Sequence, residues 1–167
     1  MSQLCFAAMP ATTIRMTGPL EPRDAWEADR CPMAAALDVV RTKSAFLVLR
    51  EAFYGATRFD EFAARTALSD PVVSARLREL VEAGLLERAG YREAGQRARQ
   101  GYRLTEMGAE LLPVLAGLMH WGDRWLETGS GVEVRHRGCG APVAAELRCE
   151  AGHAVGGDEL DLAARRR

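Results

Sequence analysis

The segment from Ser69 to Gly84 constrains the fold most strongly, because it carries both start and stop signals for one helix. Ser69 is a favoured N-cap residue, and Asp70 and Pro71 suit the positive dipole end and the first helical turn. Gly84 is a residue that commonly ends a helix. The sequence therefore predicts one capped helix over residues 70–83.

This predicted helix has two different faces. Val73, Leu77 and Leu80 recur at helical spacing and form an apolar stripe suited to a core. The opposite face carries small or polar side chains and one cation, from Pro71, Ser74, Ala75 and Arg78. A helix that enters the major groove of DNA needs a face of this size and polarity. The pattern therefore favours a recognition helix.

Helical patterns also occur on both sides of this segment. Apolar residues recur at helical spacing after Pro32 and again over residues 46–53, and a third short helix is expected to begin at residues 58–62. Thr105 is a natural cap for a long helix, whose apolar positions are Leu111, Leu112, Leu115, Leu118, Trp121, Trp125 and Leu126. One small domain does not bury that much apolar surface on one helix, so part of the stripe is expected to meet a second subunit.

A predicted hairpin lies between the recognition helix and the long helix. Two short β-prone runs, at residues 85–88 and 101–105, flank a polar stretch that contains glycine. The net charge of the chain is −1, so any contact with nucleic acid needs basic residues gathered in one place. From Arg88 to Arg103 there are five arginines and one acid. The hairpin therefore holds the segregated positive charge.

The composition and pattern predict three parts. Residues 1–29 lack a sustained period and suggest a flexible extension, residues 30–128 form the main domain, and residues 129–167 form a tail with a β-hairpin. The expected fold is mainly α with a small β wing. No run approaches the roughly 18 apolar residues of a bilayer span, and the start lacks the pattern of a secretory signal. We expect a cytoplasmic protein with no membrane partner.

Five fragments in one colinear order resemble the HxlR family of bacterial regulators, which are relatives of the MarR group. They are Cys31 with Pro32, residues 58–62, 77–88 and 102–108, and Trp121 with Gly122. The resemblance implies a winged helix-turn-helix domain that reads double-stranded DNA. It also implies a homodimer built through the first and last helices, with two recognition helices in successive major grooves.

The resemblance further implies which residues face DNA. Residues 58–66 and 70–83 are the expected helix-turn-helix pair, with Ser69 on a phosphate and Arg78 on a guanine edge or a phosphate. The full predicted set is Ser69, Pro71, Ser74, Ala75 and Arg78 on the helix, and Arg92, Arg97 and Arg99 in the wing. Gln100 and Gly101 depart from the family pattern before Tyr102, so we expect a shorter second strand or a more mobile wing.

Cysteine and histidine residues suggest two further sites. The resemblance implies a thiol sensor at Cys31, and the alternative is a small, partly buried residue near the dimer interface. In the tail, His136, Cys139, Cys149 and His153 have spacings that suit a structural zinc ion in a zinc-ribbon-like hairpin. A disulfide between Cys139 and Cys149, or a hairpin without metal, are the alternatives. No cofactor other than this candidate zinc is expected.

These observations favour a DNA-binding transcriptional regulator, more often a repressor than an activator. A thiol- or metal-responsive form of that regulator is one alternative, and a protein-interaction module that has lost DNA binding is another. A small-molecule effector is conceivable in a pocket between subunits, as in MarR relatives. We do not expect an enzyme, because the three histidines are not accompanied by a recognisable nucleophile, oxyanion element or phosphate loop.

Overall fold

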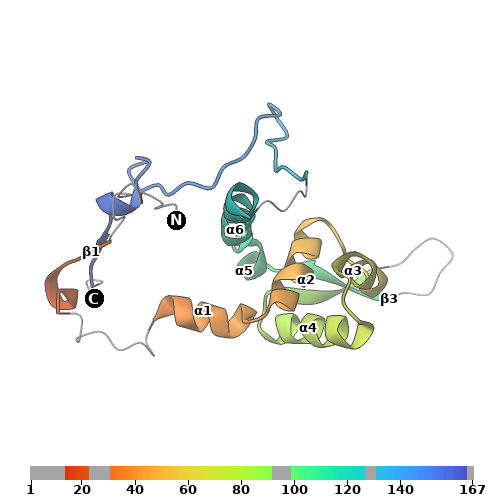
Figure 1. The fold of residues 1–167 in the computed structure, drawn as a ribbon. Coiled ribbons are helices and arrows are strands. Elements are labelled where there is room, and N and C mark those ends of the chain that lie inside the picture. Colours follow the sequence, from red (N-terminus) through yellow and green to blue (C-terminus); the bar gives the residue numbers. More distant parts are fainter. Residues whose placement is uncertain (1–13, 23–30, 92–98, 127–130, 165–167) are drawn as a thin grey trace, which may run out of the picture. The chain divides into compact units, whose positions relative to one another are not determined.

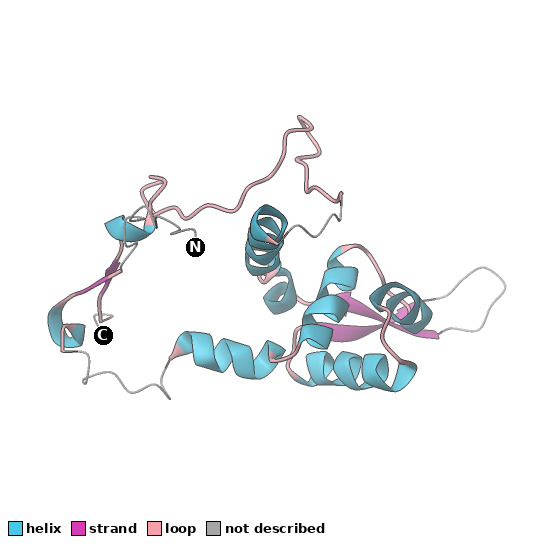
Figure 2. Cartoon of the chain, viewed as in Figure 1, coloured by secondary structure: helices cyan, strands magenta, loops and turns pink. Residues whose placement is uncertain are grey.

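The computed structural model describes residues 14–22, 31–91, 99–126 and 131–164, except for the side chains of Tyr91 and Arg99. Contacts divide the chain into two compact units, of which one is Pro32–Ala145 and the other combines the described parts of Met1–Cys31 and Glu146–Arg167. Helices dominate the first unit, and one antiparallel hairpin completes it (Figures 1 and 2). The predicted fold, mainly α with a small β wing, is confirmed.

The first four helices lie where the sequence pattern predicts them. They are α1 (Pro32–Val40), α2 (Lys43–Phe53), α3 (Phe59–Thr66) and α4 (Asp70–Glu82). Thr42 caps α2, because its Oγ1 accepts a hydrogen bond from the Ala45 N–H at 3.1 Å. Gly55 and Gly84 follow α2 and α4 with φ of 89° and 76°, a left-handed conformation that favours glycine and ends a helix.

Helices α2, α3 and α4 enclose the core of this unit. Phe62 of α3 is fully buried and meets the ring of Tyr102 edge-on, with ring centroids 6.1 Å apart and planes at 84°. The other large, fully buried side chains are Leu49, Leu77, Leu80, Leu85, Leu86, Val48 and Val73. Burying each of these contributes about 1.5–3 kcal/mol. The apolar stripe predicted for α4 therefore fixes that helix against the core.

The wing is a regular antiparallel hairpin in its described part. Strands β2 (Leu86–Tyr91) and β3 (Arg99–Leu104) pair from Leu86 opposite Leu104 to Tyr91 opposite Arg99. Both strands have six residues, and residues 92–98 between them lie outside the described residues, so the expectation of a shorter strand or a more mobile wing stays a prediction. Gly101 is buried in this ladder, opposite Ala89. Tyr102 N–H also donates to the Thr57 carbonyl at 2.8 Å and ties β3 to the chain before α3.

The single long helix expected after Thr105 is instead two helices, α5 (Glu106–Ala109) and α6 (Leu112–Trp125). Thr105 caps the first of them, since its Oγ1 accepts from the Gly108 N–H at 3.0 Å. Pro113 lies in the first turn of α6. Proline has no N–H to donate and its ring clashes with the carbonyl four residues earlier, so a continuous helix through this point is disfavoured. Proline suits a first turn, and a new helix begins there.

The second unit joins the two ends of the chain. Strand β1 (Arg15–Met16) pairs in parallel with β4 (Asp161–Leu162), and short 3₁₀ turns lie nearby at Gly18–Leu20 and Gly157–Glu159. Arg15 donates from Nε and Nη2 to the two carboxylate oxygens of Asp161, both at 2.8 Å. This hydrogen bond and charge lower the pKa of Asp161 and raise the pKa of Arg15.

The tail forms fewer strands than the sequence suggests. Residues 131–156 contain no strand of the β-hairpin expected in the tail, and isolated antiparallel bridges join Arg135 to Pro142 and Arg148 to Ala154. The turn at residues 136–141 still reverses the chain as a hairpin does, with the Gly140 N–H donating to the His136 carbonyl at 2.7 Å. Residues 131–150 are all exposed, so alternating apolar side chains have no surface on which a longer ladder could be buried.

No helix in the described residues is both long enough and apolar enough to span a membrane.

Candidate nucleic-acid interface

Helix α4 separates its side chains into a buried face and an exposed face. Val73, Leu77 and Leu80 are at most 1% exposed and anchor the helix. The predicted DNA-facing residues Ser69, Pro71, Ser74 and Arg78 are all exposed, and Ala75 is half-buried beside them. The fold thus brings the predicted residues of α4 together on one accessible surface. Small side chains there leave room for a close approach to base edges.

Ser69 occupies the N-cap position of α4, but it does not make the capping hydrogen bond that the sequence suggests. The Ser69 carbonyl instead accepts the Val73 N–H at 3.0 Å, as the first bond of the helix. Pro71 in the first turn has no N–H, so the helix start has fewer backbone donors to satisfy. The Ser69 hydroxyl is exposed at the positive end of the helix dipole, where a phosphate is favoured.

Two arginines on α4 have different surroundings. The side chain of Arg78 is 63% exposed, and its Nε lies 3.8 Å from the Glu82 carboxylate, a loose pair at the limit of an ion pair. The Arg76 side chain is only 21% exposed and holds Glu79 at 2.5 Å. Arg78 is therefore the cation of this helix that can turn toward a ligand without breaking a close ion pair.

The wing arginines are only partly within the described residues. Arg92 and Arg97 lie outside them, and Arg99 is described only by its backbone in β3. Arg88 is exposed on β2. Arg103 is held across the hairpin, with its Nε 2.6 Å from a carboxylate oxygen of Glu87. The predicted contacts of Arg92, Arg97 and Arg99 with DNA stay predictions.

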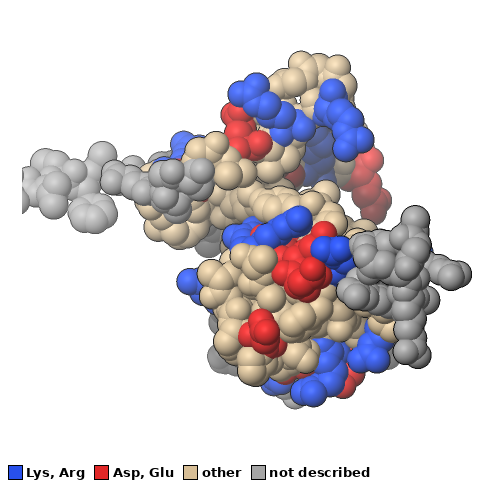
Figure 3. All heavy atoms as spheres, turned by 90° about the vertical axis from the view of Figure 1, so that its right-hand side faces the viewer, with Lys and Arg blue, Asp and Glu red and all other residues tan. Residues whose placement is uncertain are grey.

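Sequence reasoning missed three accessible residues near this surface. Arg58 precedes α3 and pairs with Asp60 at 2.9 Å, Arg65 ends α3 with a 49% exposed side chain, and Val72 of α4 is 37% exposed. The first helix of a helix-turn-helix crosses the phosphate backbone, which is the signal that could have pointed to Arg58 and Arg65. On the face of the molecule that Figure 3 shows, basic and acidic side chains lie next to one another.

A carboxylate fixes the start of α3. Glu61 Oε2 accepts the N–H groups of Thr57 and Arg58, at 2.8 and 3.0 Å. These hydrogen bonds stabilise the ionised carboxylate, with a smaller effect of the nearby guanidinium of Arg58, and they lower the pKa of Glu61. The residue after α3, Ala67, has a left-handed backbone with φ of 54°, which begins the turn between the two helices.

The predicted cysteine and zinc residues lie in different places. Cys31, a free thiol, is half-buried just before α1. His136 Nδ1 lies 3.2 Å from Cys139 Sγ in one unit, and Cys149 Sγ lies 3.6 Å from His153 Nδ1 in the other. Both distances are close to the separation of about 3.5 Å that is expected between a nitrogen ligand and a sulfur ligand of a tetrahedral zinc ion. Among the described residues no three or more His, Cys, Asp or Glu side chains gather as a metal site, so the four-ligand zinc stays a prediction.

Known proteins share the part of the chain that contains this surface. A profile of the HxlR-like helix-turn-helix family matches residues 39–130. An uncharacterized HTH-type transcriptional regulator of Mycobacterium tuberculosis (strain ATCC 25618 / H37Rv) is 40% identical over 116 residues, which cover 68% of this chain and 72% of that protein. Another, from Synechocystis sp., is 36% identical over 101 residues and covers 60% and 73% of the two chains.

Solved structures agree with the sequence matches. PA1607, named as a proposed transcription factor, superposes with a TM-score of 0.70 at 32% identity, over 81% of this chain and 95% of that one. The redox regulator HypR in its oxidized form reaches a TM-score of 0.51 at 28% identity, over 56% of this chain and 96% of its own. The family match over residues 39–130 includes α3, α4 and both strands of the wing.

Proposed function

Because this chain belongs to the HxlR-like helix-turn-helix family, we propose that it is a homodimeric repressor that inserts α4 into the major groove of its operator. Its curated relatives are named transcriptional regulators, and the family resemblance seen in the sequence is confirmed. The membership favours a regulator over an enzyme. Occupation of a promoter by the dimer would exclude RNA polymerase, in the bacterial cytoplasm where the chromosome lies.

One observation carries the proposal, namely the contrast between the two faces of α4. The core holds the helix through Leu77 and Leu80, so its position relative to α3 is rigid. The opposite face presents mainly small or polar groups around the Arg78 guanidinium. A rigid helix with such a face can enter a groove, with Arg78 on a guanine edge or a phosphate.

Phosphate contacts would position the domain on the duplex. Ser69 at the start of α4 and Arg65 of α3 are exposed, and Arg58 just before α3 is half-buried with its side chain 34% exposed. Arg92, Arg97 and Arg99 of the wing would add contacts to phosphates or to the minor groove. Such contacts release counterions, so the affinity should fall as the salt concentration rises.

A dimer is proposed from apolar surface that the single chain leaves uncovered. On α6, Leu118, Trp121 and Trp125 are 53%, 57% and 59% exposed, and we call these three residues the apolar face of α6. On α1, Met33 and Leu37 are 70% and 50% exposed. Exposed apolar surface of this extent is typical of an interface between subunits. Two domains related by twofold symmetry would read two half-sites about one helical turn apart.

The direct test is fluorescence anisotropy with the reduced full chain, zinc supplied, and duplex DNA from upstream of its own gene. We expect a Kd of about 100 nM or tighter, resistance to an unrelated competitor duplex, and weaker binding at each step of a salt series. Binding no stronger than to the unrelated duplex at every salt concentration would contradict the proposal and favour the protein-interaction module.

A thiol-responsive form of the regulator is the second candidate, because Cys31 is a half-buried free thiol beside the start of α1 and the similar structure of HypR is named a redox regulator. If oxidation of Cys31 changes the dimer, diamide should alter DNA affinity in the wild type and not in Cys31→Ser. An equal effect of diamide on the two proteins would assign the response to Cys139 or Cys149, or to another group.

The zinc prediction has its own test. We propose that the His136–Cys139 and Cys149–His153 pairs bind zinc, since each pair has the spacing of two tetrahedral ligands. Elemental analysis of protein purified with zinc should find bound zinc in the wild type, and none in Cys139→Ser with Cys149→Ser. Absence of zinc from the wild type would contradict the zinc site and favour the alternatives, a disulfide between Cys139 and Cys149 or a tail without metal.

A further inference from the structure

A cleft of about 730 Å³ lies on the side of the helix-turn-helix unit that α2 and α6 share. The last turns of α2 and the middle of α6 form two walls, and tail residues between Val132 and Ala144 form the third. All of these residues belong to the same compact unit. The tail follows α6 closely, since a Cβ on Gly117 would lie 3.8 Å from Ala145 Cβ. No described residue of β2, β3 or α4 lines this cleft.

The cleft and the apolar face of α6 lie on opposite sides of the same helix. At about 100° per residue, Ala116, Met119 and Asp123 point to one side, and the apolar face lies roughly 180° away. The first three residues line the cleft. A dimer formed through the apolar face of α6 would therefore leave this wall of the cleft uncovered.

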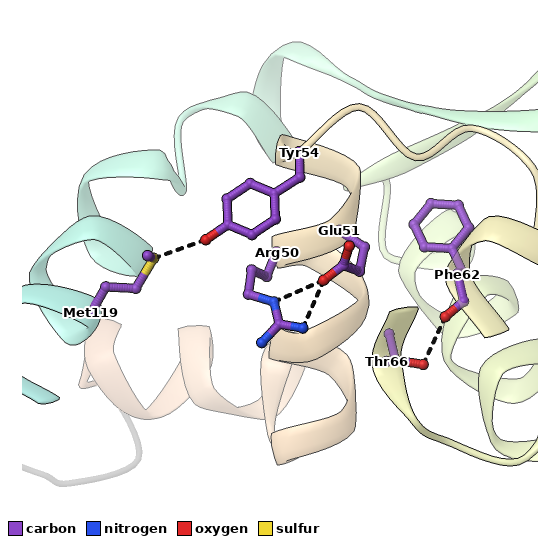
Figure 4. A network of polar contacts seen from close by, with 6 residues as sticks. All are labelled: Arg50, Glu51, Tyr54, Phe62, Thr66 and Met119. Atoms are coloured by element: carbon purple, nitrogen blue, oxygen red, sulfur yellow. Dashed lines mark hydrogen bonds and ion pairs between the residues drawn. The ribbon is translucent and has the colours of Figure 1, made fainter. Parts of the chain in front are cut away.

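A buried ion pair forms the α2 wall. The Glu51 side chain is 6% exposed, and its Oε1 accepts from Arg50 Nε at 2.9 Å and Nη2 at 2.6 Å (Figure 4). The charge of Arg50 is therefore matched by Glu51 within the wall. Tyr54 is next to this pair, with its ring centroid 6.0 Å from Arg50 Cζ, and its hydroxyl donates to Met119 Sδ at 3.6 Å. This hydrogen bond joins α2 to α6.

One carboxylate in the lining of the cleft has no ion pair among the described residues. Glu133 is held by Arg135 at 2.5 Å, so it is also matched. Asp123 lines the cleft, and no ion pair involves it within the described residues. Apolar tail residues such as Val134, Pro142 and Val143 complete the lining. A carboxylate, an aromatic ring and an apolar wall together match a cation with an apolar body.

We propose that this cleft is an effector site that binds a small organic cation of the aromatic ammonium or phosphonium class. The Asp123 carboxylate and the Tyr54 ring attract the positive centre, and Met119 with the tail covers the apolar body. This goes beyond the proposed function, because the binding needs no DNA. The site lies within one chain and is distinct from the pocket between subunits that is conceivable by analogy with MarR relatives.

Isothermal titration calorimetry of the full chain without DNA tests the site with two ions of the same shape and opposite charge. Tetraphenylphosphonium should bind once per chain, and tetraphenylborate, as its sodium salt in potassium-free buffer, at least tenfold more weakly. Asp123→Asn should weaken phosphonium binding about threefold to fivefold, the range of a partly exposed ion pair. Tyr54→Leu should weaken it by a similar factor through the loss of the cation–π contact.

Glu110→Gln is the matched control, since Glu110 is exposed after α5, lies outside the cleft, and its substitution removes the same charge. It should leave phosphonium binding unchanged. No heat of binding, equal affinity for the two ions, or an equal effect of Asp123→Asn and Glu110→Gln would each overturn the proposal. These outcomes are independent of DNA binding, so they are distinguishable from a failure of the proposed function.

Discussion

Arg78 is the residue on which DNA recognition should depend most. Its side chain is exposed on α4 and only loosely paired with Glu82. Arg78→Ala should weaken specific DNA binding by about 1–3 kcal/mol, measured by anisotropy. If Arg78 contacts a guanine edge, the preference of the variant for its operator over unrelated DNA also falls. If Arg78 contacts a phosphate, the affinity for every DNA sequence falls, and the salt dependence of binding becomes shallower.

Arg137→Ala is the control for that experiment. Arg137 is an exposed tail residue, and its substitution removes one positive charge, as Arg78→Ala does. It should change specific affinity by less than twofold. Equal affinities of Arg78→Ala and the wild type would place the recognition surface elsewhere than on the exposed face of α4.

Gly108 is a residue where any side chain should be costly. A Cβ at this position would overlap the Leu85 carbonyl oxygen and press on Leu104 Cδ2. Backbone cannot move aside as a flexible side chain can, so Gly108→Ala should lower the free energy of unfolding by about 3 kcal/mol or more. Urea unfolding followed by circular dichroism measures this.

Gly90 provides the comparison for Gly108, because a Cβ there meets nothing within 4 Å. Gly90→Ala in β2 should change the free energy of unfolding by less than about 1 kcal/mol. Similar losses in the two variants would show that the close approach of Gly108 to Leu85 does not limit stability.

The sequence predicts individual residues correctly on α4, where helical spacing separates buried from exposed side chains. The apolar stripe of α4 locates its core face, and the remaining residues on the exposed side follow from helical geometry. Arg58 and Arg65 escaped notice because α3 has no comparable run of small polar residues. The Ser69 capping bond was expected from residue type, but bond formation depends on a rotamer that residue type does not determine.

At the scale of elements, the stability that Glu61 gives to the start of α3 should depend on pH. Glu61 accepts two backbone N–H groups, and its pKa is lowered in the folded state. This contribution is present above the ordinary Glu pKa and is lost as the pH falls through the lower folded pKa. Glu61→Gln should cost about 1 kcal/mol at pH 7, and the difference from wild type should shrink below about pH 4.

Urea unfolding at several pH values measures that difference, with Glu110→Gln as the variant that removes a carboxylate without removing a cap. A difference between Glu61→Gln and wild type that stays constant down to pH 3 would contradict the role of the ionised carboxylate at the start of α3.

Element boundaries followed from local signals only in part. Gly84 and Thr105 mark their helix ends as the sequence predicts. Pro113 lies within a long apolar pattern that predicts one helix, whereas the structure has two, α5 and α6. The Tyr102 N–H bond to the Thr57 carbonyl joins β3 to a residue far away in sequence, and no local pattern reports such a contact.

For the whole molecule, the apolar face of α6 should control assembly. A charge there would be buried against the partner, so Trp121→Glu should raise the dimer dissociation constant about thirtyfold or more. Sedimentation equilibrium measures it, and Ala64→Glu, on exposed α3, should leave the dimer intact. A wild-type chain that stays monomeric at every concentration would contradict assembly through this face.

The pairing of the chain ends lay beyond sequence reasoning. Strands β1 and β4 have two residues each, and their partners are separated by 146 positions. Residues 14–22 were expected to be flexible because they have no periodic pattern, although the structure includes them in a unit with the tail. Two parallel strands this short, joined by an exposed ion pair, produce no pattern in the sequence that would predict their pairing.

Selection of binding sites from a random duplex library by the full chain tests the central claim most directly. The account predicts enrichment of an inverted repeat with half-sites about 10 bp apart, centre to centre. It also predicts that Arg78→Ala loses this enrichment and Arg137→Ala keeps it. Recovery of no common sequence by the wild-type chain, with zinc supplied and under reducing conditions, would contradict sequence-specific regulation through α4.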